Sequence, residues 1–354
     1  MNYSGDTHCD AGSTCVFVNE WYSQCQPSTG TTTTTAPTPT SCSGTTKFKF
    51  FGVNQSGAEF GNQNIPGQLG KDYTWPSPSS IDFFISQGFN TFRIPFQQER
   101  MSPPTTGGLT GSFNQTYLSG LKTIVSYITG KGAYAAIEPH NFMRFNGAII
   151  TSVSDFSNWW SKLATEFKSN SHVIFDLMNE PFGIDASTVF NLNQGAVNAI
   201  RAAGATTQMI LVEGTSWTGA WTWTTSGNSQ VFGNIRDPNN NVAIQMHQYL
   251  DQDGSGTSDI CVSSTIGVER LQAATQWLKD HNLKGFLGEI GAGSNSQCIA
   301  AVKGALCSMQ QSGVWIGALW WAAGPWWGDY FQSIEPPNGT AIAEILPQAL
   351  KPFL

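Results

Sequence analysis

The sequence predicts an α/β protein built around a (β/α)8 TIM barrel, because strand-like and helix-like segments alternate from Lys47 to the end of the chain. Strands that alternate with helices pair in parallel, and about 250 residues suffice for eight such units to close into a barrel. Amphipathic segments of helical length lie at residues 116–131, 155–169, 187–204 and 267–282. Eight apolar strand-like runs can be counted: KFKFFGVN, NTFRIPF, AYAAIEPH, VIFDLMNEP, MILVEG, VAIQMHQYL, GFLGEIG and VWIGALWWAAG.

An open, doubly wound sheet is the alternative fold for this alternation. Such a sheet usually carries a Gly-rich phosphate-binding turn after its first strand. Here the first strand continues into GVNQSGAEFG, residues 52–61, which does not match G-x-G-x-x-G. The barrel is therefore the predicted fold of residues 46–354.

The first segment, residues 1–27, contains Cys9, Cys15 and Cys25 in a stretch too short to build a core, which is typical of a disulfide-stapled module. Its run CDAGSTCVFVNEWYSQCQP resembles the C-terminal two-thirds of a fungal family 1 carbohydrate-binding module. The resemblance implies a disulfide between Cys9 and Cys25, with Cys15 left without its partner. It also implies a cellulose-binding face made of Tyr3, Asn19, Trp21, Tyr22 and Gln24.

That family has four cysteines and a further aromatic residue in an N-terminal part that has no counterpart here, so we expect a truncated module. Residues 28–45 follow it, rich in Thr and Pro and without apolar periodicity, which predicts an extended, O-glycosylated linker. Cys42, near the end of this linker, has no evident partner in the sequence.

Composition excludes some classes of function. Of 354 residues, 12% are charged, the net charge is −7 and no basic cluster occurs, which argues against nucleic acid as a partner. No run of about twenty apolar residues is present, so no membrane span is predicted. Seven Cys and sequons at Asn2, Asn54, Asn114 and Asn338 are typical of a secreted glycoprotein. The start MNYSGDTHCDAG has no export signal, so we expect a missing signal peptide, and a monomer by default.

Polar residues gather where the predicted barrel strands end, which is where such barrels build their active sites. Stability alone would select apolar residues there, because an unpaired buried ion costs several kcal/mol. Six strand ends contribute: Arg93, Glu138, His140, Asn179, Glu180, His247, Tyr249, Glu289, Trp320 and Trp321. Pro181, directly after Glu180, lacks an N–H and is expected to stop the sheet ladder so that Asn179 and Glu180 face a substrate.

Three kinds of chemistry fit these residues poorly. His140 and His247 could meet several acids, but no metal-binding spacing such as H-E-x-x-H is present, so neither a metal nor a cofactor is expected. Ser216 lies in EGTSWTG, which lacks the G-x-S-x-G elbow of a serine nucleophile. A cysteine nucleophile is the third kind of chemistry that fits poorly, because the remaining cysteines have no nearby His in the sequence: Cys261, Cys298 and Cys307.

Two carboxylates, Glu180 and Glu289, match what cleavage of a glycosidic bond requires. One carboxyl must be protonated to donate to the leaving oxygen, and the other must be ionised to attack or to activate water. Arg93 would stabilise the charge of Glu289, whereas burial and the neighbouring carboxylate would raise the pKa of Glu180.

Six motifs, NEP, GEIG, RIPF, EPHNF, HQYLD and WWAAGPWWGDY, together resemble glycoside hydrolase family 5, and within it the fungal endo-β-1,4-glucanases. The likeness covers nearly all of residues 47–354. It implies a retaining double displacement with Glu180 as acid/base and Glu289 as nucleophile. By the same resemblance Asn179 holds the sugar 2-hydroxyl, His247 and Tyr249 orient the two carboxyls, His140 and Arg93 support them, and Trp321 lies under the reacting sugar before a non-proline cis peptide.

Aromatic planes stack on the apolar faces of sugar rings, so Trp residues on the active rim predict a groove for a linear polysaccharide. Five are expected there: Trp217, Trp221, Trp223, Trp326 and Trp327. Trp159 and Trp160, on a helix, are expected in the core. A Cys261–Cys298 disulfide is plausible from their places after the sixth and seventh strands and agrees with the family, and Cys307 is expected to be a buried thiol.

The sequence thus favours a secreted enzyme that cuts internal β-1,4 bonds of cellulose and related β-glucans without a cofactor. Two alternatives stay open. A β-mannanase or exo-glucanase could use the same scaffold, because loops and subsite Trp residues select the sugar. A non-catalytic glycan-binding protein is the other alternative, although the presence of both Glu180 and Glu289 disfavours it.

Overall fold

The structure is a computed structural model, which describes residues 13–19, 22–27, 42 and 47–354. The chain divides into two compact units, Met1–Ser41 and Cys42–Leu354. In the first unit, β1 (Ser13–Asn19) and β2 (Tyr22–Pro27) pair as an antiparallel hairpin. Cys9, Tyr3 and Trp21 lie outside the described residues, as do residues 28–41 and 43–46. The Cys9–Cys25 disulfide, the cellulose-binding face and the linker therefore stay predictions.

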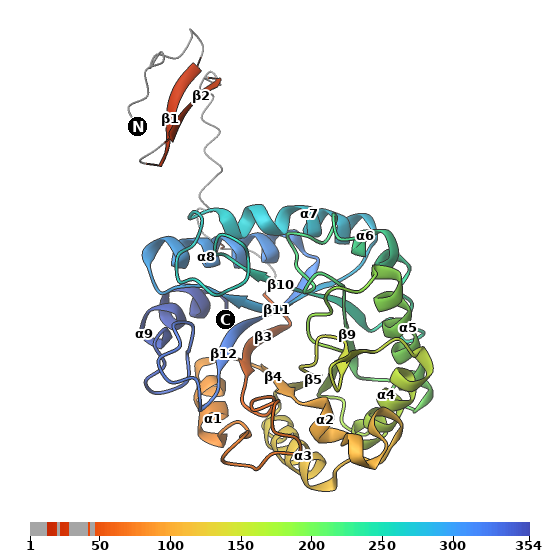
Figure 1. The fold of residues 1–354 in the computed structure, drawn as a ribbon. Coiled ribbons are helices and arrows are strands. Elements are labelled where there is room, and N and C mark those ends of the chain that lie inside the picture. Colours follow the sequence, from red (N-terminus) through yellow and green to blue (C-terminus); the bar gives the residue numbers. More distant parts are fainter. Residues whose placement is uncertain (1–12, 20–21, 28–41, 43–46) are drawn as a thin grey trace. The chain divides into compact units, whose positions relative to one another are not determined.

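The second unit is the predicted barrel (Figure 1). Eight parallel strands close in the order β10-β11-β12-β3-β4-β5-β8-β9. Their bounds are β3 (Phe50–Gln55), β4 (Thr91–Phe96), β5 (Tyr134–Pro139), β8 (Val173–Asp176), β9 (Met209–Glu213), β10 (Val242–Tyr249), β11 (Gly285–Gly291) and β12 (Trp315–Ala323). A two-stranded hairpin, β6 (Arg144–Phe145) and β7 (Ala148–Ile149), follows β5.

Helices surround this barrel on its outside (Figure 1). Side chains at the N-caps start several of them: Asn114, Ser152, Asp185 and Asn295 each accept a hydrogen bond from a backbone N–H of the first turn. The longer helices are α1 (Pro78–Gln87), α3 (Gln115–Gly130), α4 (Val153–Phe167), α5 (Ala186–Ala202), α7 (Ile266–Asp280) and α8 (Ser296–Ser312). Shorter ones are α2 (Gln98–Met101), α6 (Asn228–Val231), α9 (Ile342–Ile345), η1 (Pro104–Thr106), η2 (Gly108–Thr110), η3 (Phe232–Asn234), η4 (Leu346–Leu350) and η5 (Lys351–Phe353).

The barrel strands carry an apolar layer near their starts and a polar layer two residues later. Because alternate residues of a strand share a face, each apolar residue and the polar one after it point the same way. Four neighbouring strands repeat this pattern in the buried pairs Ala136 and Glu138, Ile174 and Asp176, Leu211 and Glu213, and Ala243 and Gln245. The apolar layer fills one end of the barrel, and polar groups occupy the other.

Two details of the predicted strands and core are wrong. The fourth barrel strand was expected to reach Pro181, but β8 ends at Asp176, so Asn179 and Glu180 lie on an irregular segment beyond it and Pro181 does not end the ladder. Trp223 was expected on the rim, but it is completely buried against Phe232 and Trp277. Trp159 and Trp160 are completely buried, as predicted.

Two disulfides tie the barrel unit. Cys261 and Cys298 are bonded, as predicted, with their Cα atoms 5.4 Å apart. Cys42 and Cys307 are also bonded, across a sequence separation of 265 residues. The expectations of a partnerless Cys42 and a buried Cys307 thiol are therefore wrong. Nothing in the local sequence signals a bond between residues so distant, because only the closure of the barrel unit brings them together.

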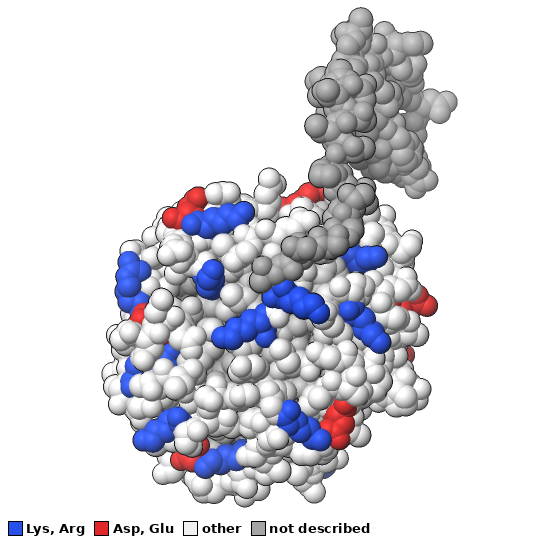
Figure 2. All heavy atoms as spheres, turned by 180° about the vertical axis from the view of Figure 1, so that it is seen from behind, with Lys and Arg blue, Asp and Glu red and all other residues white. Residues whose placement is uncertain are grey.

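The surface agrees with the low content of charged residues. Figure 2 shows one face on which Lys, Arg, Asp and Glu stand singly or in small groups among uncharged side chains. Of the predicted glycosylation sites, Asn338 is exposed, whereas Asn54 is completely buried, so the folded protein offers no glycan site at Asn54. Within the part of the chain that the structure describes, no helix is both long and apolar enough to span a membrane.

Candidate active site

Arg93, on β4, is the centre of the polar layer. It is completely buried, and a buried cation needs charged or hydrogen-bonding partners. Its guanidinium donates to Asp176 Oδ2 at 2.7 Å, Glu289 Oε1 at 2.8 Å, Asn179 Oδ1 at 2.8 Å, Asn54 Oδ1 at 3.0 Å and Glu213 Oε1 at 3.3 Å. A single arginine thereby fixes side chains from five different segments of the barrel rim.

The carboxyl groups around Arg93 outnumber its charge. Glu138 Oε2 lies 3.5 Å from the guanidinium, in addition to Asp176, Glu213 and Glu289. Burial raises the pKa of Asp176 to about 6, although Arg93 acts in the opposite direction. Burial, and after it the charge of Asp176, raises the pKa of Glu213 well above its ordinary value. This cluster therefore binds protons more tightly than carboxyl groups in water do.

Glu289, at the end of β11, is held by two strong donors. Its Oε1 accepts from Arg93, and its Oε2 accepts from the Tyr249 hydroxyl at 2.5 Å. Burial, with the charge of Glu289 added, raises the pKa of Tyr249 well above its usual value, so the hydroxyl keeps its proton and donates. Both contacts favour the ionised carboxylate of Glu289.

Glu180 lies on the irregular segment after β8 and has different partners. Its Oε1 is 2.7 Å from Nδ1 of His247, and its backbone N–H donates to Glu213 Oε2 at 2.7 Å. Burial and the charge of Glu289 raise the pKa of Glu180 well above the ordinary value. Burial, with the charges of Arg93 and His140, lowers the pKa of His247 well below its ordinary value, so this imidazole is neutral.

Glu180, Glu289 and His247 meet at one point. One side-chain atom of each lies within 4.8 Å of the other two, and among the described residues this is the group whose geometry could hold a metal ion. Without any metal, the pair of carboxyls already combines a proton donor with an ionised group close by. This combination is what acid-assisted cleavage of a glycosidic bond requires.

His140 and Trp321 stand beside this pair. His140 Nδ1 is 3.1 Å from Glu138 Oε2, and its Nε2 is 3.3 Å from the Asn179 amide nitrogen. Burial opposes a charge on His140, but the charge and hydrogen bond of Glu138, together with the charges of Glu59 and Glu289, raise the pKa of His140 to about 9. The His140 ring stacks on Trp321 at a centroid distance of 5.6 Å, and the peptide bond after Trp321 is cis. All seven residues predicted to act at the site are therefore within one network.

Two cavities, each of about 500 Å³, share a boundary at Glu180. Glu180, Tyr249 and Ser255 line both of them. The first is further lined by Trp217, Trp221, His247, Gln248 and Asp253, and the second by His140, Asn179, Glu289, Trp321 and Tyr330. Glu180 therefore lies on the lining that the two cavities share, whereas Glu289 lines the second cavity only.

Exposed tryptophans of the first cavity rest on built supports. Trp217, 54% exposed, stacks on Phe182 at 5.0 Å with the rings 7° from parallel. Trp221, 49% exposed, has the Arg270 guanidinium 4.3 Å from its ring centre. Trp326, also predicted to bind substrate, is 39% exposed but is not among the residues that line these two cavities. Trp327 is half-buried and packs on Trp321 and Tyr330.

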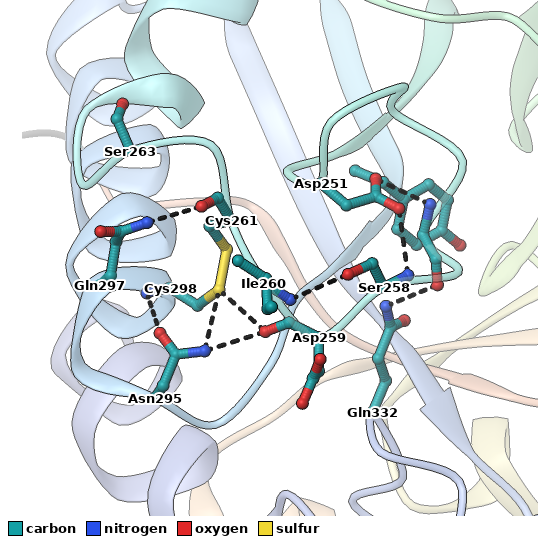
Figure 3. Close-up of a disulfide and its surroundings, with 12 residues drawn as sticks. Asp251, Ser258, Asp259, Ile260, Cys261, Ser263, Asn295, Gln297, Cys298 and Gln332 are labelled. Atoms are coloured by element: carbon teal, nitrogen blue, oxygen red, sulfur yellow. Dashed lines mark hydrogen bonds between the residues drawn. A yellow bond between two sulfur atoms is a disulfide. The ribbon is translucent and has the colours of Figure 1, made fainter. Parts of the chain in front are cut away.

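The loop after β10 lines both cavities. Contacts hold it at both of its ends (Figure 3). Asp251 is buried, and its carboxylate accepts backbone N–H bonds from Gly256, Thr257 and Ser258 at 3.0 to 3.1 Å. The Cys261–Cys298 disulfide anchors the far end. Figure 3 also shows Asn295 and Gln297 bonded to backbone oxygens of this loop, and Gln332 lying beside it. The loop position is thus set by covalent and polar contacts together.

The sequence interpretation missed four residues of the polar layer: Asn54, Asp176, Glu213 and Gln245. Each lies inside an apolar barrel strand or at its end, and three of them follow an apolar interior residue by two positions. The signal that could have found them is the alternation of side chains along a strand. Residues two positions apart share a face, so a polar residue two positions after an interior apolar residue also faces the barrel interior.

Comparison with known proteins agrees with this geometry. A family model described as cellulase (glycosyl hydrolase family 5) matches residues 53–325, and one described as fungal cellulose binding domain matches residues 1–22. The chain is 51% identical to Endoglucanase 3 of Humicola insolens over 352 residues, which is 96% of this chain and 89% of that protein. It is 53% identical to Endo-beta-1,4-glucanase B of Emericella nidulans over 300 residues, 84% of this chain and 90% of that protein.

The solved structure of XacCel5A in complex with cellopentaose is similar to this fold, with a TM-score of 0.79 and 40% sequence identity. The similarity covers 82% of this chain and 95% of that chain. Both the sequence matches and the shared fold span the barrel that carries Arg93, Glu180 and Glu289. The chain therefore belongs to glycosyl hydrolase family 5.

Proposed function

We propose that this protein is a secreted endo-β-1,4-glucanase that hydrolyses internal bonds of cellulose and related β-glucans with net retention. One observation carries the proposal: oxygen atoms of Glu180 and Glu289 lie within 4.8 Å of each other, with burial and the charge of Glu289 raising the pKa of Glu180 and with Arg93 donating to Glu289. Retaining enzymes separate their two carboxyl groups by about 5 to 5.5 Å, whereas inverting enzymes leave about 6.5 to 9.5 Å for a water molecule.

In the proposed reaction, Glu180 gives its proton to the leaving glycosidic oxygen while a Glu289 oxygen attacks the anomeric carbon. The resulting glycosyl-enzyme is hydrolysed when Glu180, now a carboxylate, takes a proton from the attacking water. Arg93 and Tyr249 hold the Glu289 carboxylate, and neutral His247 orients Glu180. Asn179 would bind the 2-hydroxyl of the reacting sugar.

The choice of a linear glucan as substrate rests on the groove and on the relatives. Two adjoining cavities that share Glu180 suit cleavage within a chain, and Trp217 and Trp221 offer stacking surfaces in one of them. The two curated relatives are named as endoglucanases, and the XacCel5A structure contains cellopentaose. The cellulose-binding match and two disulfides support export from the cell. We propose a monomer.

Release of new reducing ends from a soluble β-1,4-glucan and from β-1,4-mannan, with Glu289→Ala as the blank, tests the proposal. Fast release from glucan, absent in the variant, is the expected result. Release from mannan alone would keep the mechanism but change the substrate. A fall in viscosity that merely tracks reducing ends would indicate exo action, and absence of turnover on either polymer would favour a glycan-binding protein. NMR of the first-formed anomer tests retention.

A further inference from the structure

We propose that Glu213, a buried carboxyl group at the end of β9, is a positioning residue that holds Glu180 from its backbone and, through His247, from its side chain. This inference rests on the proposed function, in which Glu180 is the acid/base. Glu213 touches neither cavity, so it would act only through these two neighbours.

The first contact fixes an unusual backbone. Glu180 has a φ of +43°, a left-handed conformation that a residue with a side chain adopts only where its surroundings hold it. The segment before it is tied by Leu177 N–H to Leu211 O and by Asn179 N–H to Pro139 O, both at 3.1 Å. Glu213 Oε2 accepts the N–H of Glu180 itself at 2.7 Å, so it provides the tie at the strained residue.

The second contact runs through an imidazole. Nδ1 of His247 is 2.7 Å from Glu180 Oε1, and Glu213 Oε1 is 3.7 Å from Nε2 of the same ring. That Nε2 is buried and has no hydrogen-bond partner among the described residues. A neutral imidazole carries its proton on one nitrogen only, so the group that faces Nε2 influences whether Nδ1 donates a hydrogen bond to Glu180 or accepts one from it. Glu213 is therefore placed to set the tautomer as well as the backbone.

The surroundings of Glu213 are fully occupied by charged and titratable groups. Those that face it from the neighbouring elements are Arg93, Glu138, Asp176, Glu180 and His247. Gln245 donates to Glu213 Oε1, and Asn193 on α5 donates to its backbone oxygen at 3.1 Å, which fixes the end of β9. The carboxyl group thus has little freedom to move away from Glu180.

The competing explanation is that Glu213 is only a counter-ion for Arg93. Asp176 offers a matched control, because it shares both Arg93 and Gln245 with Glu213. Within the described part of the chain, no hydrogen bond or ion pair joins Asp176 to Glu180 or to His247. Loss of Asp176 should therefore disturb the Arg93 cluster, and with it Glu289, without a selective effect on the acid/base.

Leaving-group dependence separates the two explanations, because a good leaving group departs without protonation and so does not need the acid. We would measure kcat/KM on a phenyl β-cellobioside with a poor leaving group and on dinitrophenyl β-cellobioside, with Glu180→Ala as the reference for loss of the acid. For Glu213→Ala we expect a loss of about 100-fold on the first substrate and less than about 5-fold on the second. Asp176→Ala should lower both by similar factors.

Equal losses on the two substrates for Glu213→Ala would overturn the proposal, as would no loss on either. Glu213→Gln keeps the volume and an oxygen for the Glu180 N–H, so it tests the idea if the Ala variant fails to fold by circular dichroism. Its loss should be smaller but still confined to the poor leaving group, and an unselective loss would again refute the positioning role. Lack of turnover in the unsubstituted protein would instead refute the proposed function itself.

Discussion

Two carboxyl groups that lie within 4.8 Å of each other have opposite surroundings. Glu289 lies on a regular strand, between the cationic Arg93 and the Tyr249 hydroxyl, and both stabilise a negative charge. Glu180 lies beyond a strand end, beside a neutral imidazole and the backbone-binding Glu213, which offer no positive charge. The same functional group therefore receives two roles from its neighbours, and changes to those neighbours should affect the two roles unequally.

The largest effect is expected from Glu289→Ala, because no other group can form the glycosyl-enzyme. Turnover of a soluble β-glucan should fall at least about 10⁴-fold, while glucan binding measured by calorimetry stays within about threefold. The exposed Glu344→Gln is the control and should change neither quantity. Retained turnover would show that Glu289 is not the nucleophile, and the two carboxyl groups would then not have the different roles described above.

Tyr249→Phe removes one of the two donors to Glu289 and should lower kcat about 10- to 100-fold, the usual cost of a hydrogen bond to a charged group. The loss should be equal for good and poor leaving groups, because the nucleophile acts on both. Tyr127→Phe is the control, since its hydroxyl donates to Asp82 and the residue lines neither cavity. A loss confined to poor leaving groups would place Tyr249 on the side of Glu180.

Stability should fall as pH rises, because the buried cluster holds protons that an unfolded chain releases. Asp176 has a pKa of about 6 against an ordinary 3.8, so its contribution is present at low pH and is lost between these values. His140, at about 9 against 6.5, loses its contribution over that higher range. The free energy of unfolding should drop by about 4 kcal/mol from pH 5 to pH 9.

Thermal unfolding followed by circular dichroism measures this trend. Asp176→Asn should flatten the curve at its acidic end and leave the slope above pH 6.5 unchanged. A melting temperature that rises from pH 5 to pH 9 would contradict the raised pKa values of Asp176 and His140.

The smallest effect concerns the cavity that Glu180 lines and Glu289 does not. Trp221→Ala should raise KM for a soluble β-glucan about threefold to tenfold with kcat nearly unchanged, because the indole contributes stacking energy in both ground and transition states. Trp326→Ala, which removes an indole outside both cavities, should leave KM unchanged. Equal effects of the two substitutions would mean that the substrate path is not the one that Trp217 and Trp221 mark.

The sequence could predict the barrel and the network around Glu180 and Glu289, because period and strand-end polarity are local signals. It could not predict that β8 ends at Asp176, since the following residues Leu177 and Met178 are as apolar as a strand and only strand pairing decides its length. The sequence could not predict the burial of Trp223 for a related reason. A tryptophan next to rim residues gives no sign of which side its ring takes until the neighbouring helices are in place.

Glu213 and Gln245 were missed because a polar residue in an apolar strand is usually assigned to the solvated side. Only the closed barrel shows that this face is an enclosed interior in which several acids surround one arginine. These residues are easy to overlook in the sequence. An apolar residue in the place of either would nevertheless take a polar partner away from the buried cluster around Arg93.

The Cys42–Cys307 bond has a mechanical consequence. Cys42 is the first residue of the barrel unit, and the bond joins it to α8 rather than to the strand that follows. Any tension that reaches Cys42 along the preceding chain passes into α8 through a covalent link. The hydrogen bonds that hold β3 beside β4 and β12 are then spared the load, and the active end of the barrel keeps its shape under strain.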